Sequence, residues 1–107
     1  MNVGQVRRLA LALPEATEEP HFDLTSFRVR GKIFATAATD GSFMNIFVDD
    51  DQREVMVAVD PKAYETLKWG KTPYLHVHLA AAKSRDVKLL LRAAWERRAP
   101  KKLLAQA

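Results

Sequence analysis

Two histidines placed two positions apart, His76 and His78, are the residues of this sequence best suited to metal or acid–base chemistry. They stand in the segment PYLHVHL (73–79), in which polar and apolar side chains alternate. Because successive side chains of a strand point to opposite faces, we expect Tyr74, His76 and His78 to share one face of a strand over 74–79. The apolar residues between them then share the other face.

A zinc site needs more than two imidazoles, and the sequence places no third ligand beside this pair. The chain has no cysteine, which excludes a thiolate zinc site, a disulfide and a cysteine nucleophile. No carboxylate is placed beside the pair for acid–base catalysis. We therefore expect His76 and His78 to form the polar face of a half-buried strand, with no metal bound.

Other catalytic motifs are absent from the sequence. No G-x-S-x-G elbow surrounds Ser26, Ser42 or Ser84, and the four glycines form no phosphate-binding loop. The acidic run 49–51 lacks the spacing of an EF-hand and is better explained by helix capping. We expect a protein that is not an enzyme and has no cofactor.

Basic residues are the second feature with a chemical interpretation. Arg28, Arg30 and Lys32 occupy alternate positions through the tip of an expected hairpin, where two or three cations can project together and grip phosphates. A solvated hairpin has the same pattern. A second basic group lies towards the end of the chain and comprises Arg92, Arg97, Arg98, Lys101 and Lys102.

The net charge of +4 is concentrated at one end of the chain. From position 83 onward eight basic and two acidic residues give +6, whereas positions 1–82 give −2. Such asymmetry indicates an anionic partner or a solvated helix face, and the sequence alone leaves both open.

Periodicity predicts an α+β fold of one antiparallel sheet with helices at both ends. Helical spacing covers 3–13 and 84–98, the second capped by Ser84, and Asp50 or Asp51 is placed to cap a short helix between them. A further helical turn is expected from Asp60 and Pro61. The expected strands are 24–29, 32–38, 43–48 and 74–79, a meander plus a fourth strand, and the segment PEATEEPHFD (14–23) is expected as an acidic loop.

We expect the helices to pack on one face of the sheet around a single core. Its predicted members are Phe27, Val29, Ile33, Ile46, Leu75, Val77, Val87, Leu91 and Trp95.

Length and composition favour a single domain over residues 1–107. No apolar run approaches the roughly 20 residues of a membrane span, and the first residues lack the pattern of a signal peptide. We therefore expect a cytoplasmic protein with no membrane partner, and we favour a monomer.

Several of these segments together resemble the MmcQ/YjbR family of small bacterial proteins. The resemblance rests on LALPEATEEPHFD, on FRVRGKIFATA (27–37) with Gly31 and Lys32 at the turn, and on the order of elements that follows. It implies a sheet with helices packed on one face, similar in fold to the CyaY/frataxin type, and a DNA-binding role proposed for a double-wing arrangement. It implies no catalytic residue.

The leading hypothesis is a nucleic-acid-binding protein that contacts phosphates through the basic hairpin and the basic end of the last helix. The alternative is a small-ligand or protein-interaction module on the face of Tyr74, His76 and His78. A frataxin-like metal-binding role is the third hypothesis, and it would depend on Glu15, Glu18 and Glu19.

Overall fold

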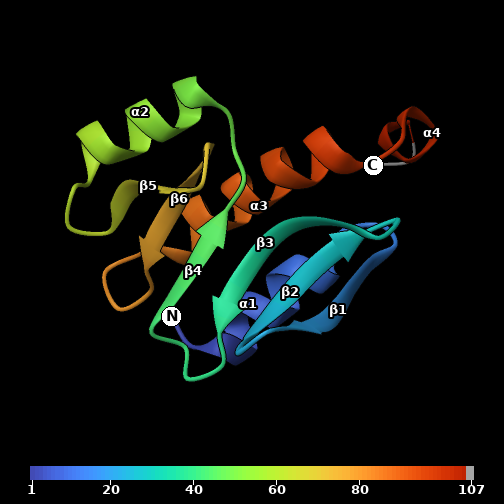
Figure 1. Cartoon of the computed structure of the whole chain (residues 1–107), viewed down its shortest axis with the longest axis horizontal. Helices are drawn as coiled ribbons and strands as arrows, with labels where there is room; N and C mark the ends of the chain where they lie inside the picture. Colours follow the sequence, from blue (N-terminus) through green and yellow to red (C-terminus); the bar gives the residue numbers. More distant parts are fainter. Residues whose placement is uncertain (106–107) are drawn as a thin grey trace.

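Six antiparallel strands form one sheet in the computed structural model, which describes residues 1–105 (Figure 1). The strands run in the order β1-β2-β3-β4-β6-β5, so β1 and β5 are the edges. Their bounds are β1 (Ala16–His21), β2 (Leu24–Val29), β3 (Lys32–Ala38), β4 (Phe43–Ile46), β5 (Tyr64–Trp69) and β6 (Thr72–His78). The predicted α+β class with an antiparallel sheet is confirmed.

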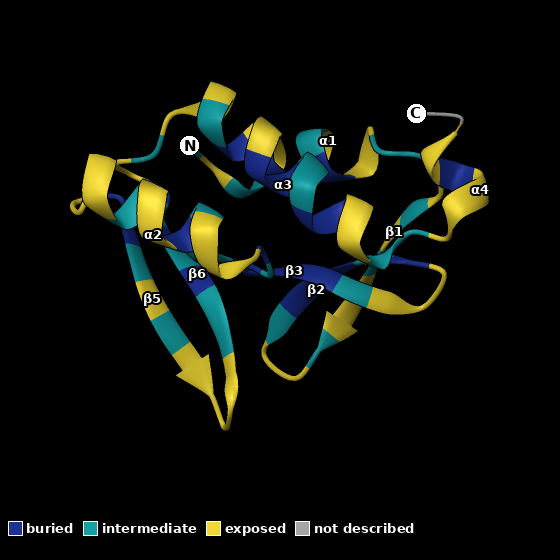
Figure 2. Ribbon diagram, turned by 90° about the horizontal axis from the view of Figure 1, so that it is seen from above, coloured by how far each residue is buried: buried dark blue, intermediate teal, exposed yellow. Residues whose placement is uncertain are grey.

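Helices cover one side of this sheet and leave the other side open (Figure 2). They are α1 (Val3–Leu11), α2 (Asp50–Val59), α3 (Ser84–Arg98) and α4 (Lys101–Leu104). Asn2 begins α1 in a capping box with Gln5, whose backbone N–H donates to the Asn2 side chain. We call the uncovered side the open face of the sheet.

Two predicted helix caps are wrong by one residue. Asp49, rather than Asp50 or Asp51, accepts the capping hydrogen bond of α2 from the Gln52 backbone. Ser84 is already inside α3, and the residue at the N-cap position, Lys83, makes no capping bond. Asp50 and Asp51 instead lie in the first turn of α2, where negative charge favours the helix dipole.

The core between sheet and helices contains all but one of the predicted residues. Phe27, Val29, Ile46, Leu75, Val77, Val87, Leu91 and Trp95 are fully buried. Ile33 is only half-buried, because a register shift between Phe27 and Arg28 lets Phe34 turn inward and leaves Ile33 opposite Arg28 on the open face. A bulge of this kind breaks the simple alternation on which the prediction relied.

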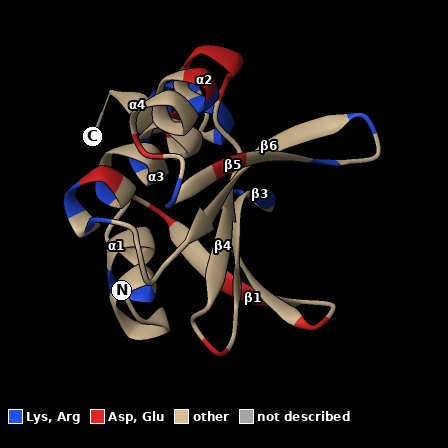
Figure 3. Cartoon of the chain, turned by 90° about the vertical axis from the view of Figure 1, so that its left-hand side faces the viewer, with Lys and Arg blue, Asp and Glu red and all other residues tan. Residues whose placement is uncertain are grey.

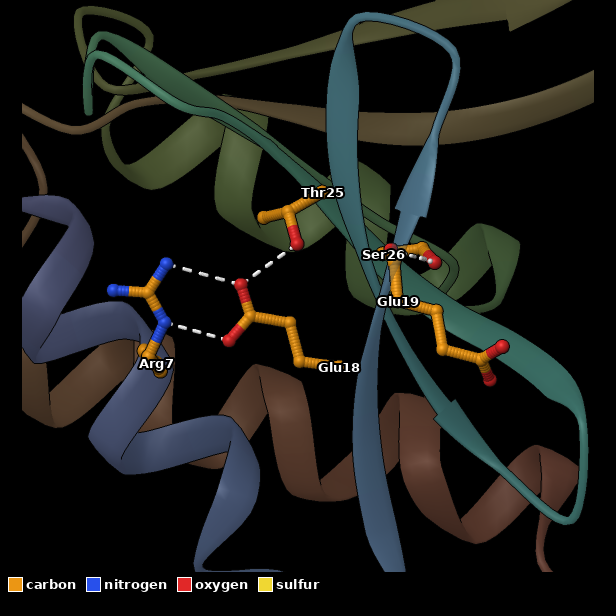
Figure 4. A network of polar contacts seen from close by, with 5 residues as sticks. All are labelled: Arg7, Glu18, Glu19, Thr25 and Ser26. Atoms are coloured by element: carbon orange, nitrogen blue, oxygen red, sulfur yellow. Dashed lines mark hydrogen bonds and ion pairs between the residues drawn. The ribbon is translucent and has the colours of Figure 1, made fainter.

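The middle of the acidic segment 14–23 forms strand β1 rather than the predicted loop. Pro20 is tolerated in β1 because this strand lies at the edge of the sheet and pairs only with β2. Glu18 points towards the helices, where Arg7 of α1 donates two hydrogen bonds to its carboxylate at 2.6 and 3.0 Å (Figure 4). The Thr25 hydroxyl donates a third at 2.7 Å, so the charged edge strand is tied to the rest of the fold.

A hydrogen-bonded turn does begin at Asp60, as predicted, since the backbone N–H groups of Ala63 and Tyr64 donate to the Asp60 carbonyl. The strand that follows it, β5, was not predicted. The chain leaves α2 at Asp60, makes a short turn, and pairs from Tyr64 onward with β6. Helix α3 ends before Pro100 as predicted, but a short helix, α4, follows it and buries Leu103. No helix within residues 1–105 is long and apolar enough to cross a membrane.

Candidate functional site

One polar residue from each strand forms a row across the open face. Each residue is the register partner of the next, so their side chains share this face. In strand order the row is Glu19, Ser26, Thr36, Asn45, His76 and Glu65. The predicted placement of Tyr74, His76 and His78 on the non-core face of their strand is confirmed, since Leu75, Val77 and Leu79 are buried.

The centre of the row is a chain of hydrogen bonds. The Asn45 amide nitrogen donates to the Thr36 hydroxyl at 3.1 Å, and the Asn45 oxygen lies 2.7 Å from His76 Nδ1. Because that oxygen is an acceptor, His76 Nδ1 carries the proton and Nε2 is left with the lone pair. Burial, and then the proximity of His78, lowers the pKa of His76 below its ordinary value, so the ring is held neutral.

His78 is engaged with a carboxylate rather than with a metal ligand set. Its Nε2 lies 3.1 Å from Glu65, and its ring centroid lies 4.9 Å from that of His76. Within the part of the chain that the structure describes, no three His, Cys, Asp or Glu side chains are placed to hold a metal ion. All three acids considered for a frataxin-like role are paired with arginines: Glu15 with Arg30, Glu18 with Arg7, and Glu19 with Arg28.

Beside this row the open face is hollowed by about 740 Å³. The lining brings three cations together from different elements: Arg28 of β2, Lys32 of β3 and Arg98 of α3. It also contains four aromatic rings, those of Phe22, Phe47, Trp69 and Tyr74. The only acidic residue in the lining as described is Asp23. The hollow is therefore positive and rich in aromatic surface.

The three cations differ in how firmly they are held. Arg28 donates from Nε to the Ser26 hydroxyl at 3.0 Å and lies 3.7 Å from the Glu19 carboxylate, so its guanidinium is oriented over β2. Among residues 1–105, no ion pair joins Lys32 or Arg98 to a carboxylate. Both are therefore available to an anion in the hollow.

The structure does not bring the other predicted cations into this hollow. Arg30 turns away to form a two-point contact with Glu15, at 2.6 and 3.1 Å. Arg92 lies 3.7 Å from Glu96 on the surface of α3. Arg97 donates to the Phe47 carbonyl at 2.7 Å, and Lys101 and Lys102 are exposed on α4.

Two of the predicted ligand-face residues also lie outside the lining. Tyr74 is part of the hollow, whereas His76 reaches it only through Asn45, and His78 faces Glu65. The side chains that the sequence interpretation missed are Phe22 and Trp69. Trp69 directly precedes Gly70, a hairpin-turn signal that would have indicated the β5–β6 hairpin.

A smaller hollow of about 220 Å³ adjoins Arg98 on the side of α2. It is lined by three arginines, Arg53, Arg97 and Arg98, and by Asp49 and Asp50. Arg53 is buried and donates to the Val48 carbonyl and to Asp50. Its charge is thus satisfied within the fold, and it anchors the start of α2 beside the open face.

Comparison with known proteins bears on the family and on the fold. A sequence model described as YjbR matches residues 11–97. The crystal structure of the Deinococcus radiodurans protein DR2400, described as a DUF419 domain, is similar with a TM-score of 0.74 at 19% identity. That similarity covers 88% of this chain and 75% of the other, and at this identity it shows a shared fold. A search of curated proteins gives no significant match.

Proposed function

The chain belongs to the YjbR family, and from the chemistry of its open face we propose that it is a nonenzymatic nucleic-acid-binding protein. In this proposal Arg28, Lys32 and Arg98 contact phosphates. The observation that carries the proposal is the convergence of these three cations, from three separate elements, on one hollow with a single acidic residue among its described lining.

Further positive charge surrounds the hollow at its rim. Lys71 is exposed at the turn between β5 and β6, where Figure 3 shows basic residues at the tip of the hairpin. Arg97 lies next to Arg98 along α3. We assign these residues, together with Arg30, Arg92, Lys101 and Lys102, a secondary role in attracting the polyanion.

Binding is proposed rather than catalysis because of how the two histidines are engaged. They are the groups best suited to acid–base chemistry, yet neither lines the hollow. The histidine that does line it, His21, packs with its ring centroid 4.8 Å from that of Phe22. His76 is bonded to Asn45 and His78 to Glu65.

The test is a fluorescence anisotropy titration of a labelled oligonucleotide at two salt concentrations. Phosphate contacts release counterions, so the logarithm of the affinity falls with the logarithm of the salt concentration, by a slope of about 0.9 per contact on duplex DNA. Lys32→Gln is expected to weaken binding and to reduce that slope by about one contact. Lys88→Gln removes an equal charge from an exposed position of α3 and is expected to change the affinity and the slope little. The proposal fails if the parent protein binds neither single strand nor duplex at low salt.

A small anionic ligand is the second candidate, because the volume of the hollow lies within the range of roughly 300–1,000 Å³ typical of small-molecule sites. Competition separates the two candidates. If a mononucleotide displaces the oligonucleotide only at a far higher concentration, nucleic acid is the favoured ligand. If the protein binds the mononucleotide and the oligonucleotide with comparable affinity, a small anionic ligand is favoured.

A further inference from the structure

Two large aromatic side chains stand at the rim of the hollow and are exposed. Phe22 is 87% exposed and Trp69 is 68% exposed, although both line the hollow. Residues of this kind are usually buried when they serve only the fold. They come from opposite edges of the sheet, since Phe22 follows β1 and Trp69 ends β5.

Both rings are presented by short, paired turns. Phe22 lies between His21 and Leu24, which pair with each other, and Trp69 pairs with Thr72 across Gly70. The Phe22 backbone has a φ of 58°, in the left-handed region that bulky residues seldom occupy. Backbone strain of this kind persists where the surrounding structure enforces it, and it gathers at binding sites.

We propose that the hollow binds a single strand of nucleic acid, with unpaired bases stacked on Trp69 and Phe22 while the phosphates meet Arg28, Lys32 and Arg98. This inference rests on the proposed function and adds the class of nucleic acid to it. In a duplex the base faces are covered by their neighbours, so an aromatic side chain can stack only on a base that has left the stack. A site for an undistorted duplex needs cations but gains no stacking from exposed rings at its rim.

The floor of the hollow argues against a strong sequence preference. Asn45, its only side-chain amide within the described lining, is already bonded to Thr36 and to His76. Its amide is therefore not free to make a two-point contact with a base edge, whereas stacking accepts every base because each has a π-face. The strand is therefore expected to bind with weak dependence on its sequence.

The experiment compares a labelled 12-nucleotide strand of DNA with the same sequence in duplex form, at one salt concentration. The parent protein is expected to bind the single strand at least 10-fold more tightly. Trp69→Ala and Phe22→Ala are each expected to weaken single-strand binding by roughly 5- to 100-fold, with little effect on duplex. Trp69→Phe keeps an aromatic face and should restore most of the affinity, and Leu89→Ala, an exposed apolar residue of α3, is the matched control.

Tryptophan fluorescence provides an independent readout of stacking. Trp69 is exposed whereas Trp95 is fully buried and donates its indole N–H to the Pro14 carbonyl. Quenching on addition of the single strand should therefore come from Trp69, and it should be absent in Trp69→Phe even where binding remains.

The outcomes separate this inference from the proposed function. Equal affinity for both forms, or single-strand binding that neither alanine variant weakens, overturns the inference and leaves phosphate binding intact. The inference and the proposed function are both supported if Lys32→Gln and Arg98→Gln lose binding of single strand and of duplex, while the aromatic variants lose binding of single strand alone. If the parent protein binds neither single strand nor duplex, the inference and the proposed function are both contradicted.

Discussion

His76 is the residue whose ionisation is most directly set by the open face. Its Nδ1 is engaged with Asn45, it is partly buried, and a second imidazole stands beside it. Burial and the second imidazole disfavour a positive charge and lower the pKa of His76, whereas the Asn45 oxygen fixes which nitrogen carries the proton. The proton on His76 Nδ1 keeps the Thr36–Asn45–His76 chain of hydrogen bonds in one arrangement.

Protonation of His76 should therefore destabilise the folded protein. The unfolded chain takes up this proton near pH 6.5, whereas the lowered pKa of His76 means that the folded protein takes it up only at lower pH. Stability contributed by this site is present above pH 6.5 and falls as the pH drops towards the folded pKa. An NMR titration of the ring and urea unfolding at pH 5 and pH 7.5 measure this effect.

His76→Gln is the matched variant, since glutamine cannot titrate. Its stability should change less between the two pH values than that of the parent protein. A folded His76 that titrates above pH 6.5 would contradict this assignment of its environment.

Arg30 and Lys32 test whether position or charge alone determines nucleic-acid binding. They are two residues apart, but Arg30 is held by Glu15 outside the hollow and Lys32 lines it. Arg30→Gln is expected to leave affinity within about 2-fold of the parent, since a screened surface charge contributes little, while Lys32→Gln weakens it. Equal losses in the same anisotropy assay would show that the hairpin acts only through its net charge.

For single residues, the sequence predicted which face of a strand a side chain occupies, but not which other side chain it contacts. Alternation placed Tyr74, His76 and His78 correctly, because strand geometry depends only on neighbouring residues. The pairing of Arg30 with Glu15 brings together residues 15 positions apart, through a strand that the sequence pattern did not reveal. No local rule identifies such a contact.

Among the elements, the central strands and the long helix were predictable and the two edge strands were not. β2, β3 and α3 follow clear period-2 or helical patterns, and their observed bounds equal the predicted ones. β1 carries two glutamates and a proline, a composition that disfavours strand but suits an edge whose charges meet Arg7 and solvent. β5 alternates over a short and largely exposed span, so no apolar stripe marks it.

Helix α3 provides a direct test of the packing between helices and sheet. Leu91 is fully buried in the core, whereas Leu89 on the same helix is 66% exposed. Leu91→Ala is expected to lower the free energy of unfolding by roughly 2–5 kcal/mol, and Leu89→Ala should change it by less than about 0.5 kcal/mol. Urea denaturation of the two variants measures the difference, and equal losses would mean that the helix is rotated from its described position.

Helix α2 is anchored by a buried charge rather than by an apolar stripe. Arg53 is 6% exposed and donates to the Val48 carbonyl and to Asp50. Arg53→Leu leaves that carbonyl without its donor, which should lower the free energy of unfolding by roughly 1–3 kcal/mol. Thermal and urea unfolding check this, with Arg85→Leu, at an exposed position of α3, as the control.

The hollow itself is a property of the whole molecule. Its lining comes from the end of β1 and the turn after it, from strands β2, β3, β4, β5 and β6, and from the end of α3. The β5–β6 hairpin extends away from the helices (Figure 2), and Trp69, Thr72 and Tyr74 of this hairpin line the hollow. Because two of the contributing strands were not predicted, the sequence interpretation assigned the cations to a hairpin tip and a helix end instead of to one concave surface.

The central claim is that nucleic acid occupies this hollow, and chemical-shift mapping with a short single strand tests it most directly. The backbone amides of Arg28 and Lys32 and the indole N–H of Trp69 should shift, while the buried indole N–H of Trp95 should stay in place. Shifts centred on Val55 and Leu89 on the helical side, or no shifts at low salt, would contradict the account.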